Sequence, residues 1–346
     1  MGNIIYAKSD SSLDPVIGKY EHPIKMVISS ESDLYRKNHA IVPKLFNVEK
    51  STRYSETAIG ESNFDVFKVT EEGQGAENDS IGNTYRKTIY HSQFMKEFTI
   101  TAEMMEDAKY GIATEAKRRA AAFARAYEKT RNKLAAKALY SGTAATMNFA
   151  NGTFDITSPD NKPLFHGAHT FSTDKMAGKT QSNLFHSAIA DTAALENTLN
   201  RAANAMRNFW DEDGEVLGYV PDLIVIPGNR AGLEAMVKKV CGSEREAGSN
   251  KNDINIQYGN WGIVVLTDWV AADDRFILMS SEANKNLNGS VFYDRVPLTV
   301  SNWVDRHTGN YIWTGRARMG VGHYSWKHTS MVIAADKATD GSTALM

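Results

Sequence analysis

The sequence predicts an α+β fold, and three regions of the 346-residue chain support this class. Residues 112–141 contain no Gly or Pro and are rich in Ala, Arg, Lys and Glu, so they predict one long helix. Residues 192–210 repeat apolar side chains at helical spacing, which predicts a second helix. From residue 254 onward the pattern changes to short runs that are typical of β-strands.

The first 50 residues predict an N-terminal arm rather than a domain of their own. They are mixed in composition, weakly periodic and interrupted by Pro15, Pro23 and Pro43. We interpret them as an extended segment with short strands or helical turns. Segments of this kind usually become ordered by lying on another part of a protein.

A long acidic hairpin is predicted next. Residues 64–69 and 84–101 are rich in β-branched and aromatic side chains, which indicates two strands. Between residues 60 and 83, Lys68 is outnumbered by six acidic side chains: Glu61, Asp65, Glu71, Glu72, Glu77 and Asp79. The glycine-rich tip has too few apolar groups to fold back on its own domain, so it either extends into solvent or docks on another chain.

The helix over 112–141 combines a narrow apolar seam with a strongly basic remainder, and Thr101 is expected to cap a short helix before it. The seam residues share one helical face: Ile112, Ala116, Phe123, Tyr127, Leu134 and Ala138. Eight cations are opposed by Glu115 and Glu128: Lys117, Arg118, Arg119, Arg125, Lys129, Arg131, Lys133 and Lys137. Such a helix is about 45 Å long at about 1.5 Å per residue. We interpret it as a spine along a sheet, with its outer face toward solvent or a polyanion.

Local patterns predict the remaining elements. A core stripe runs through the second helix: Leu195, Leu199, Ala202, Met206 and Phe209. Residues 223–226 form an apolar strand that includes Ile224 and Ile226, and a helix follows over 230–240. Further strands are expected at 263–266, 276–279, 291–293, 298–303, 311–318 and 331–334. Residues 307–310 indicate a hairpin turn, and the polar C-terminal tail is expected to be loose.

Composition excludes several classes of protein. The net charge of −2 gives no overall preference for nucleic acid, so any such contact must arise from a local excess of cations. The single cysteine, Cys241, excludes an intramolecular disulfide and a zinc-finger pattern. No apolar run approaches 18 residues, and the N-terminus lacks the pattern of a secretory signal.

No strong catalytic motif is present. The triplet 178–180 lacks the leading glycine and the strand of a phosphate-binding loop, and the triplet 320–322 lacks the third glycine of a dinucleotide site. His166 and His169 could approach one metal ion, but no carboxylate is close in sequence, so loop packing is favoured. We therefore predict no catalytic residues, no cofactor and no metal ligands. This favours a structural, self-assembling protein over an enzyme, with a hydrolase built on residues 200–300 as the alternative from another class.

Four stretches carry a resemblance to a known family: 50–56, 100–107, 164–169 and 205–227. The last contains Met206 and Phe209, then Asp213-Gly214, and then the run PDLIVIP from Pro221. In this order the stretches resemble the major capsid (head) proteins of tailed bacteriophages, in particular the Mu-like type. The likeness extends over about residues 45 to 330.

The resemblance implies the Hong Kong 97 (HK97) capsid fold. The expected parts are an N-terminal arm (1–50), an extended loop (51–100), a peripheral domain (101–185 and 290–335), an axial domain (186–289) and a C-terminal tail (336–346). Many members carry a scaffolding segment fused at the N-terminus. Little chain precedes the loop here, so a separate scaffolding protein is expected.

The resemblance also implies a function. The subunit would assemble into pentamers and hexamers of an icosahedral head that encloses double-stranded DNA, within the cytoplasm of a bacterial host. Its expected partners are further copies of itself, a scaffolding protein and a portal, with a decoration protein as a further candidate and no membrane. An encapsulin-like cellular shell is the alternative within the same fold.

Three sets of residues are expected to carry this function. An intersubunit contact is expected from the extended loop: Glu71, Glu72, Glu77 and Asp79. A DNA-facing surface in the lumen is expected from the spine helix: Arg118, Arg119, Arg125 and Lys129. The core of the axial domain is expected to contain Met206, Phe209, Ile224 and Ile226.

Overall fold

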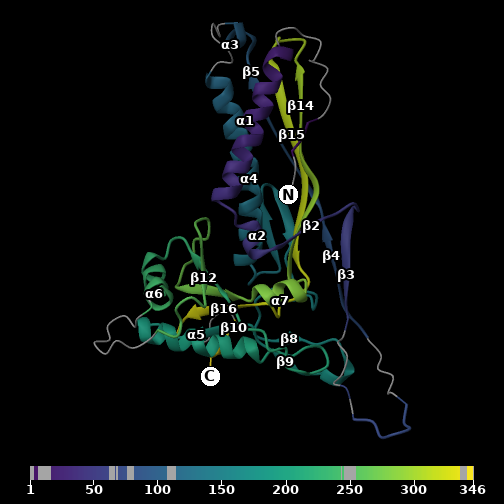
Figure 1. Cartoon of the computed structure of the whole chain (residues 1–346), viewed down its shortest axis with the longest axis vertical. Coiled ribbons are helices and arrows are strands. Elements are labelled where there is room, and N and C mark those ends of the chain that lie inside the picture. The colour runs from purple at the N-terminus through teal and green to yellow at the C-terminus, as the bar shows by residue number, and fades with distance from the viewer. Residues whose placement is uncertain are drawn as a thin grey trace. The chain divides into compact units, whose positions relative to one another are not determined.

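The computed structural model describes residues 4–6, 17–61, 67, 69–75, 82–106, 114–242, 244, 255–335 and 341–345 (Figure 1). The chain divides into two compact units. Unit 1 contains Met1–Glu56, Ile89–Ala135 and Phe292–Val321. Unit 2 contains Thr57–Thr88, Ala136–Val291 and Gly322–Met346. The predicted peripheral segments 136–185 and 322–335 therefore belong to the same unit as the predicted axial segment.

Unit 1 is built on a sheet with long central strands. Its order is β1 (Ile5–Tyr6), β14 (Ser290–Val304), β15 (Tyr311–His323) and β5 (Ser92–Ile100), and β2 (Asn47–Lys50) also pairs with β14. β5 pairs antiparallel with β15 over its whole length. The turn predicted between β14 and β15 is confirmed. Asp305 stabilises it by accepting hydrogen bonds from the His307 amide at 3.1 Å and the Thr308 hydroxyl at 2.7 Å.

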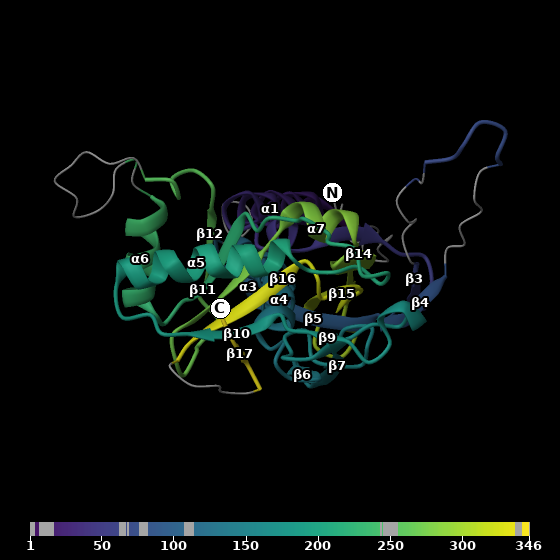
Figure 2. The same cartoon turned by 90° about the horizontal axis from the view of Figure 1, so that it is seen from below.

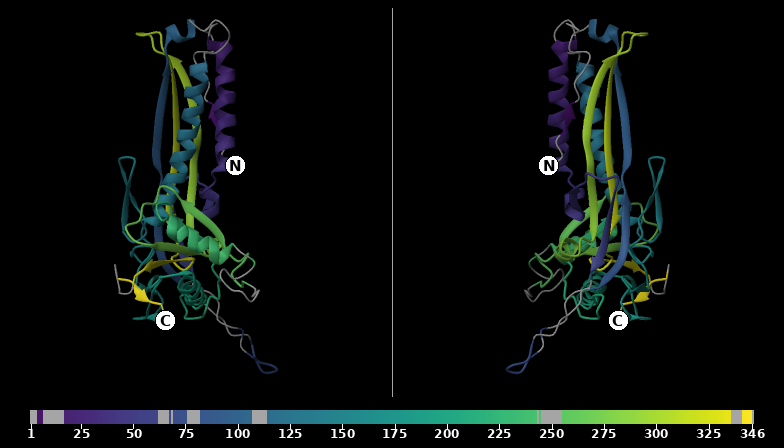
Figure 3. Two further views of the ribbon diagram at one scale, coloured as in Figure 1. Left: turned by 90° about the vertical axis from the view of Figure 1, so that its left-hand side faces the viewer. Right: turned by 90° about the vertical axis from the view of Figure 1, so that its right-hand side faces the viewer.

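Two long helices lie side by side on one face of this sheet, α1 (Ile17–Asn38) and α4 (Thr114–Tyr140) (Figures 1 and 3). Two short helices accompany them, α2 (Val42–Leu45) and α3 (Ala102–Glu106), and the Thr101 hydroxyl caps α3 through the Met104 amide at 3.3 Å. α1 and α4 run in the same direction, because Arg125 contacts Glu31 and, further along both helices, Asn132 contacts the carbonyl of His39. The predicted spine helix is confirmed in α4.

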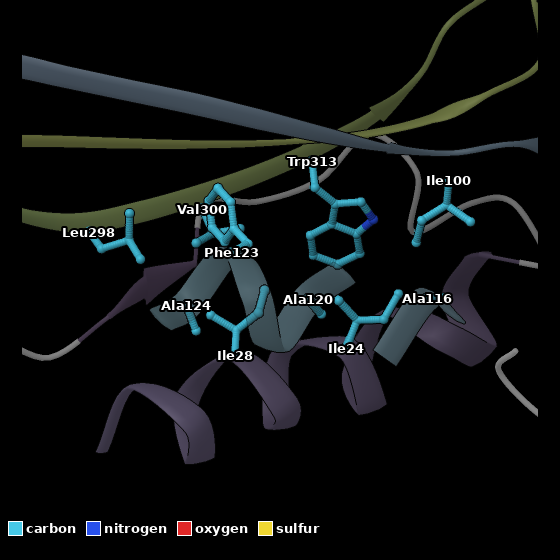
Figure 4. Close-up of a cluster of buried hydrophobic side chains, with 10 residues drawn as sticks. All are labelled: Ile24, Ile28, Ile100, Ala116, Ala120, Phe123, Ala124, Leu298, Val300 and Trp313. Carbon is cyan, nitrogen blue, oxygen red and sulfur yellow. The ribbon is translucent and has the colours of Figure 1, made fainter. Parts of the chain in front are cut away.

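A buried apolar cluster holds these helices on the sheet (Figure 4). It contains Ile24 and Ile28 of α1, Ala116, Ala120, Phe123 and Ala124 of α4, and Ile100, Leu298, Val300 and Trp313 of the strands. The alanines let the helices approach closely. Gly315 is required beneath Phe123, because a Cβ at this position would lie 2.3 Å from the ring.

The prediction of an arm with only short elements is wrong for residues 17–38, which form the 22-residue helix α1. Pro23 lies inside this helix and removes one backbone donor. Ile24, Ile28 and Ser32 are nevertheless spaced by four residues and are fully or almost fully buried against the rest of unit 1. Burial of this stripe outweighs the local effect of the proline.

The strands of the predicted hairpin are displaced along the chain. The structure pairs β3 (Ser55–Glu61) with β4 (Asn83–Tyr90), and the Thr57 and Thr88 hydroxyls hydrogen-bond at 2.8 Å. The predicted strand at 64–69 is wrong where the structure describes it, because Phe67 and Val69 belong to no strand. His91 divides the second predicted strand into β4 and β5.

Unit 2 contains a six-stranded mixed sheet. Its order is β12 (Gly262–Leu266), β11 (Leu223–Pro227), β13 (Arg275–Met279), β16 (Thr329–Ala334), β10 (Leu184–Ser187) and β17 (Thr343–Ala344). Helix α5 (Thr192–Arg207) lies across this sheet, beside α6 (Ala231–Cys241), and α7 (Ser281–Asn286) follows β13 (Figure 2). The segment between α4 and β10 forms two small hairpins, β6 (Thr146–Phe149) with β7 (Gly152–Asp155), and β8 (His169–Thr170) with β9 (Thr180–Gln181), and a short turn of 3-10 helix, Asp174–Met176.

Part of the C-terminal tail is ordered by the sheet. Thr343 pairs with Phe185, so β17 is the edge strand beside β10. Ser342 is buried, and its hydroxyl lies 3.1 Å from Nδ1 of His186. The expectation of a loose tail is therefore wrong for these residues.

Candidate assembly surfaces

The predicted core residues of the axial segment are buried within unit 2. Met206 and Phe209, at the end of α5, are each 1% exposed, and Ile224 and Ile226 of β11 are 0% exposed. The Phe209 ring meets the edge of Trp326 at a centroid distance of 5.4 Å. These four residues therefore belong to the buried core of unit 2.

The predicted cations of the spine helix are exposed to different degrees and are mostly paired. Arg118 is 74% exposed and lies 2.8 Å from Glu115. Arg119 contacts the same carboxylate and donates to the carbonyl of Thr99 at 2.6 Å. Arg125 forms an ion pair of 2.9 Å with Glu31 of α1, and Lys129 is exposed. Sequence reasoning did not find these pairs, since Glu31 and Thr99 are distant in the chain.

A buried ionic network on α4 was also missed. Glu128 accepts hydrogen bonds from Arg36 at 2.7 Å and Ser32 at 2.6 Å, both on α1. Arg131 contacts Asp294 of β14 at 2.6 Å and lies 3.6 Å from Glu128. Burial alone would lower the pKa of Arg36, but the hydrogen bond and charge of Glu128 outweigh it and raise that pKa. Burial raises the pKa of Asp294, although Arg131 opposes this.

The network has a signal in the sequence. Ala120, Ala124, Ala135 and Ala138 form a small-residue stripe along α4, and positions 128 and 131 continue it. A charged residue within a stripe of this spacing is either a break in the apolar face or half of a buried pair. The structure shows the second case.

The described part of the acidic loop exposes both carboxylates and apolar side chains. Glu71 and Glu72 are exposed, and neither forms an ion pair with a described cation. The tip turns at Gly73, whose φ of 88° favours glycine. Phe67 and Val69 are fully exposed. The other two predicted loop residues, Glu77 and Asp79, lie outside the described residues.

Unit 1 carries a patch of exposed and partly exposed side chains, which we call the tyrosine–arginine patch. It consists of Tyr54, Tyr90, Arg295, Arg316 and Arg318. The two tyrosine rings, 72% and 62% exposed, meet edge to face with centroids 6.1 Å apart. No described carboxylate lies within ion-pair distance of the three arginines. Sequence analysis missed this patch because its members come from four separate segments.

Hydrogen bonds hold two arginines of the patch in place. Nε of Arg295 donates to the carbonyl of Arg53 at 2.9 Å, and Nε of Arg316 donates to the side chain of Gln93 at 3.0 Å. Burial lowers the pKa of the adjacent His91, and the charges of Arg318 and Arg295 lower it further, while Glu56 opposes them. Arg295 and Arg318 therefore lie close to a neutral histidine and have no described carboxylate within ion-pair distance.

His169 is buried with a carboxylate that the sequence did not suggest. Its Nδ1 lies 2.8 Å from Asp160, while Nε2 faces the carbonyl of Leu164 and the amide oxygen of Asn183. Burial alone would raise the pKa of Asp160, but the hydrogen bonds and charge of its partners, chiefly His169, lower it to about 2. Both ring nitrogens therefore face polar groups of the surrounding loop and of Asn183, and the ring is held by contacts within unit 2.

The ring of His169 also stacks on Trp326 at a centroid distance of 4.4 Å. This contact fixes the loop 164–171 against the core of unit 2 and fits the loop-packing interpretation. Two other buried histidines, His323 and His328, both contact the hydroxyl of Ser290. Burial lowers the pKa of His323 to about 4 and that of His328 to about 3, so both are neutral.

Neither metal binding nor membrane insertion is indicated by the part of the chain that the structure describes. There, no three His, Cys, Asp or Glu side chains converge as metal ligands. No described helix is long and apolar enough to cross a membrane. The candidate functional surfaces are the exposed groups of the loop, the patch and the spine helix.

A model of a family described as phage capsid protein matches residues 87–332, which is well over half of the chain. The chain belongs to the phage capsid protein family. It is a structural major capsid protein and not an enzyme, as the sequence predicted. A search of curated proteins finds no match.

Solved capsid structures confirm the fold of this capsid protein. A chain of Mycobacterium phage Patience is 13% identical, with a TM-score of 0.51 over 99% of this chain and 97% of that one. The capsid of Myoviridae phage XM1 is 13% identical, with a TM-score of 0.51 over 84% of this chain and 89% of that one. The capsid of cyanophage P-SCSP1u is 10% identical, with a TM-score of 0.51 over 86% of this chain and 89% of that one. The predicted α+β class and HK97-like capsid fold are confirmed.

Proposed function

We propose that this capsid protein assembles into pentamers and hexamers of an icosahedral head that encloses double-stranded DNA. The observation that carries the proposal is the family match over residues 87–332. The acidic loop and the tyrosine–arginine patch add support, because each exposes unpaired charge and apolar area that suit contacts between copies.

Electron microscopy of the purified, expressed protein tests this function. We expect closed shells whose vertices and faces resolve as five- and six-subunit rings. Particles purified from the native host are then treated with nuclease, opened and analysed for content. Protected genomic DNA is expected, whereas a protein cargo without DNA would support the encapsulin-like alternative. A protein that stays monomeric at high concentration and with its assembly partners would contradict the proposal.

The remaining partners follow the same proposal. A separate scaffolding protein would direct shell size, a portal would occupy one vertex, and a decoration protein would bind the outside. Assembly would take place in the cytoplasm of the bacterial host. The Mu-like type stays a prediction that rests on the order of the four stretches 50–56, 100–107, 164–169 and 205–227. The names arm, extended loop, peripheral domain and axial domain are proposed on the same basis.

We propose that the loop between β3 and β4 is an intersubunit clamp. A two-stranded ribbon is marginally stable alone in water. The loop exposes Phe67, Val69 and Glu71 before its tip and Glu72 at the tip, and none of these side chains has a described partner within the chain. A neighbouring subunit would supply both the apolar contact and the counter-charge.

The basic face of the spine helix would contact packaged DNA in the lumen without reading its sequence. Arg118, Arg125 and Lys129 supply the exposed cations, but Glu115 and Glu31 already neutralise part of the charge. Each phosphate contact weakens with salt because counterions compete for the phosphates. The contact is therefore expected to be weaker than eight cations alone would suggest.

Neutralising Arg118, Arg125 and Lys129 with Gln is expected to leave empty shells intact and to lower DNA retention severalfold at raised salt. The measurement is the DNA content of purified particles across a salt series. Lys239→Gln, on the exposed side of α6, is the matched control. Unchanged retention in the triple variant would show that these cations serve only solubility.

A further inference from the structure

The described part of the acidic loop alternates in chemistry along a short stretch. Phe67 and Val69 are two residues apart and fully exposed, and Glu71 and Glu72 follow immediately. In an extended chain, Phe67 and Glu71 are separated by at most about 13 Å, and Val69 and Glu71 by about 7 Å. The loop therefore presents the apolar side chains of Phe67 and Val69, followed within about 7–13 Å by the carboxylates of Glu71 and Glu72.

The tyrosine–arginine patch has the complementary order. A Cβ on Gly320 would lie 3.0 Å from the carbonyl of Tyr90, so Tyr90 lies beside Gly320 of β15. Arg318 and Arg316 precede Gly320 by two and four residues on the same strand. At about 3.3 Å per residue they lie about 7 Å and about 13 Å from this point along the strand. The aromatic pair and the cations are thus spaced like the apolar and acidic groups of the loop.

We propose that the tyrosine–arginine patch of one subunit binds Phe67, Val69, Glu71 and Glu72 in the loop of a neighbouring subunit. Phe67 and Val69 pack on the exposed rings of Tyr54 and Tyr90, while Glu71 and Glu72 pair with the arginines. Carboxylate recognition suits guanidinium groups, which donate in a planar fork. The proposal rests on the loop being an intersubunit clamp and names the surface that receives it.

The same arginines could in principle bind the phosphates of DNA, but the patch favours a protein segment. Two tyrosines with large exposed areas stand beside the cations, and a double helix offers them no apolar surface in return. The loop offers both kinds of group in the required order. Its own subunit leaves Phe67 and Val69 exposed, so the matching partner is a second copy of this chain.

A charge exchange tests the acidic half of the contact. Glu71→Arg with Glu72→Arg is expected to lower the yield of shells at least tenfold, as is Arg316→Glu with Arg318→Glu. The variant that carries all four changes is expected to recover most of the yield, because the opposite charges meet again. Glu282→Arg with Lys239→Glu, at exposed positions of unit 2, controls for a general effect of charge reversal.

A disulfide trap tests the apolar half without depending on charge. Shells that carry Phe67→Cys and Tyr90→Cys are expected to give covalent ladders of subunits under mild oxidation, whereas each single change gives none. The native Cys241 is buried and adds little background. The reduced variant also reports whether shells form at all, so a missing ladder in intact shells would overturn the proposal.

The outcomes separate this proposal from the clamp itself. If removal of the loop tip prevents shells but the four-change variant is not rescued and no ladder forms, the clamp stands and the patch is not its binding surface. If Arg316→Glu with Arg318→Glu forms normal shells that lose DNA, the patch binds phosphates and the proposal is wrong. Rescue together with a ladder supports both.

Discussion

Replacing Ile224 with Asp is expected to eliminate soluble, assembly-competent subunit. Ile224 is fully buried in β11, where it is paired with Ile263 on one side and Leu278 on the other. An unpaired carboxylate at this position costs several kcal/mol, a large part of the roughly 5–15 kcal/mol that stabilises an ordinary domain. The measurement is the soluble fraction after expression, followed by urea unfolding of any protein recovered.

Two variants control this experiment. Ile224→Val removes one methylene group and is expected to cost about 0.5–1.5 kcal/mol while shells still form. Val220→Asp places the same charge in the exposed segment before β11 and is expected to be tolerated, because Val220 is 47% exposed. Soluble Ile224→Asp subunits that assemble normally would contradict a buried central strand.

Deleting residues 72–81 is expected to leave a folded subunit and to prevent stable shells. The deletion removes the tip of the loop, while β3 and β4 keep their pairing. Each exposed polar contact is worth at most about 1 kcal/mol. The contact is repeated at every subunit of a ring, so the total loss is large. Circular dichroism measures folding of the subunit, and electron microscopy with sedimentation measures shells.

A replacement of equal length makes this test specific. When residues 72–81 are exchanged for a Gly/Ser segment, the loop keeps its reach but loses the charges of Glu72, Glu77 and Asp79. We expect shells to be lost here too if the acidic groups carry the contact. Shells from the Gly/Ser variant together with failure of the deletion would assign the effect to loop length. Normal shells from both would refute an intersubunit clamp.

Local patterns were sufficient to predict the elements whose own sequence determines them. α4 follows from an uninterrupted run of helix-forming residues, with Ala116 and Leu134 on its buried face. β11 follows from four consecutive apolar residues that end at a proline and a glycine. These elements bury their apolar groups along their whole length, so the periodicity of the sequence is also the periodicity of burial.

The sequence could not predict features that depend on contacts between distant residues. The partners of α1 lie about 90 residues away on α4, and Pro23 suggested a break where packing maintains a helix. The first loop strand was displaced because Phe67 and Val69 favour strands but have no partner strand. Asp160 was overlooked as the partner of His169 because the intervening turn, and not the sequence pattern, brings them together.

Of the candidate surfaces, too, one is visible in the local sequence and another depends on contacts between distant residues. The excess of acidic residues in the loop is visible in the sequence, because they are contiguous. The tyrosine–arginine patch is not, since Tyr54, Tyr90 and Arg316 become neighbours only after β5, β14 and β15 have paired. Ion pairs also lower the effective positive charge of the spine helix below the value counted from the sequence. Glu115 and Glu31 largely cancel the fields of Arg118 and Arg125.

The ionic network between α1 and α4 makes the N-terminal helix inseparable from the subunit. Proteolytic or engineered trimming to residue 38 would remove Arg36 and Ser32 and leave the buried carboxylate of Glu128 with Arg131 alone. It would also uncover the apolar positions that Ile24 and Ile28 now fill. Fusions that extend the chain at its N-terminus preserve these contacts, whereas shortened subunits would be aggregation-prone and would enter a shell as defects.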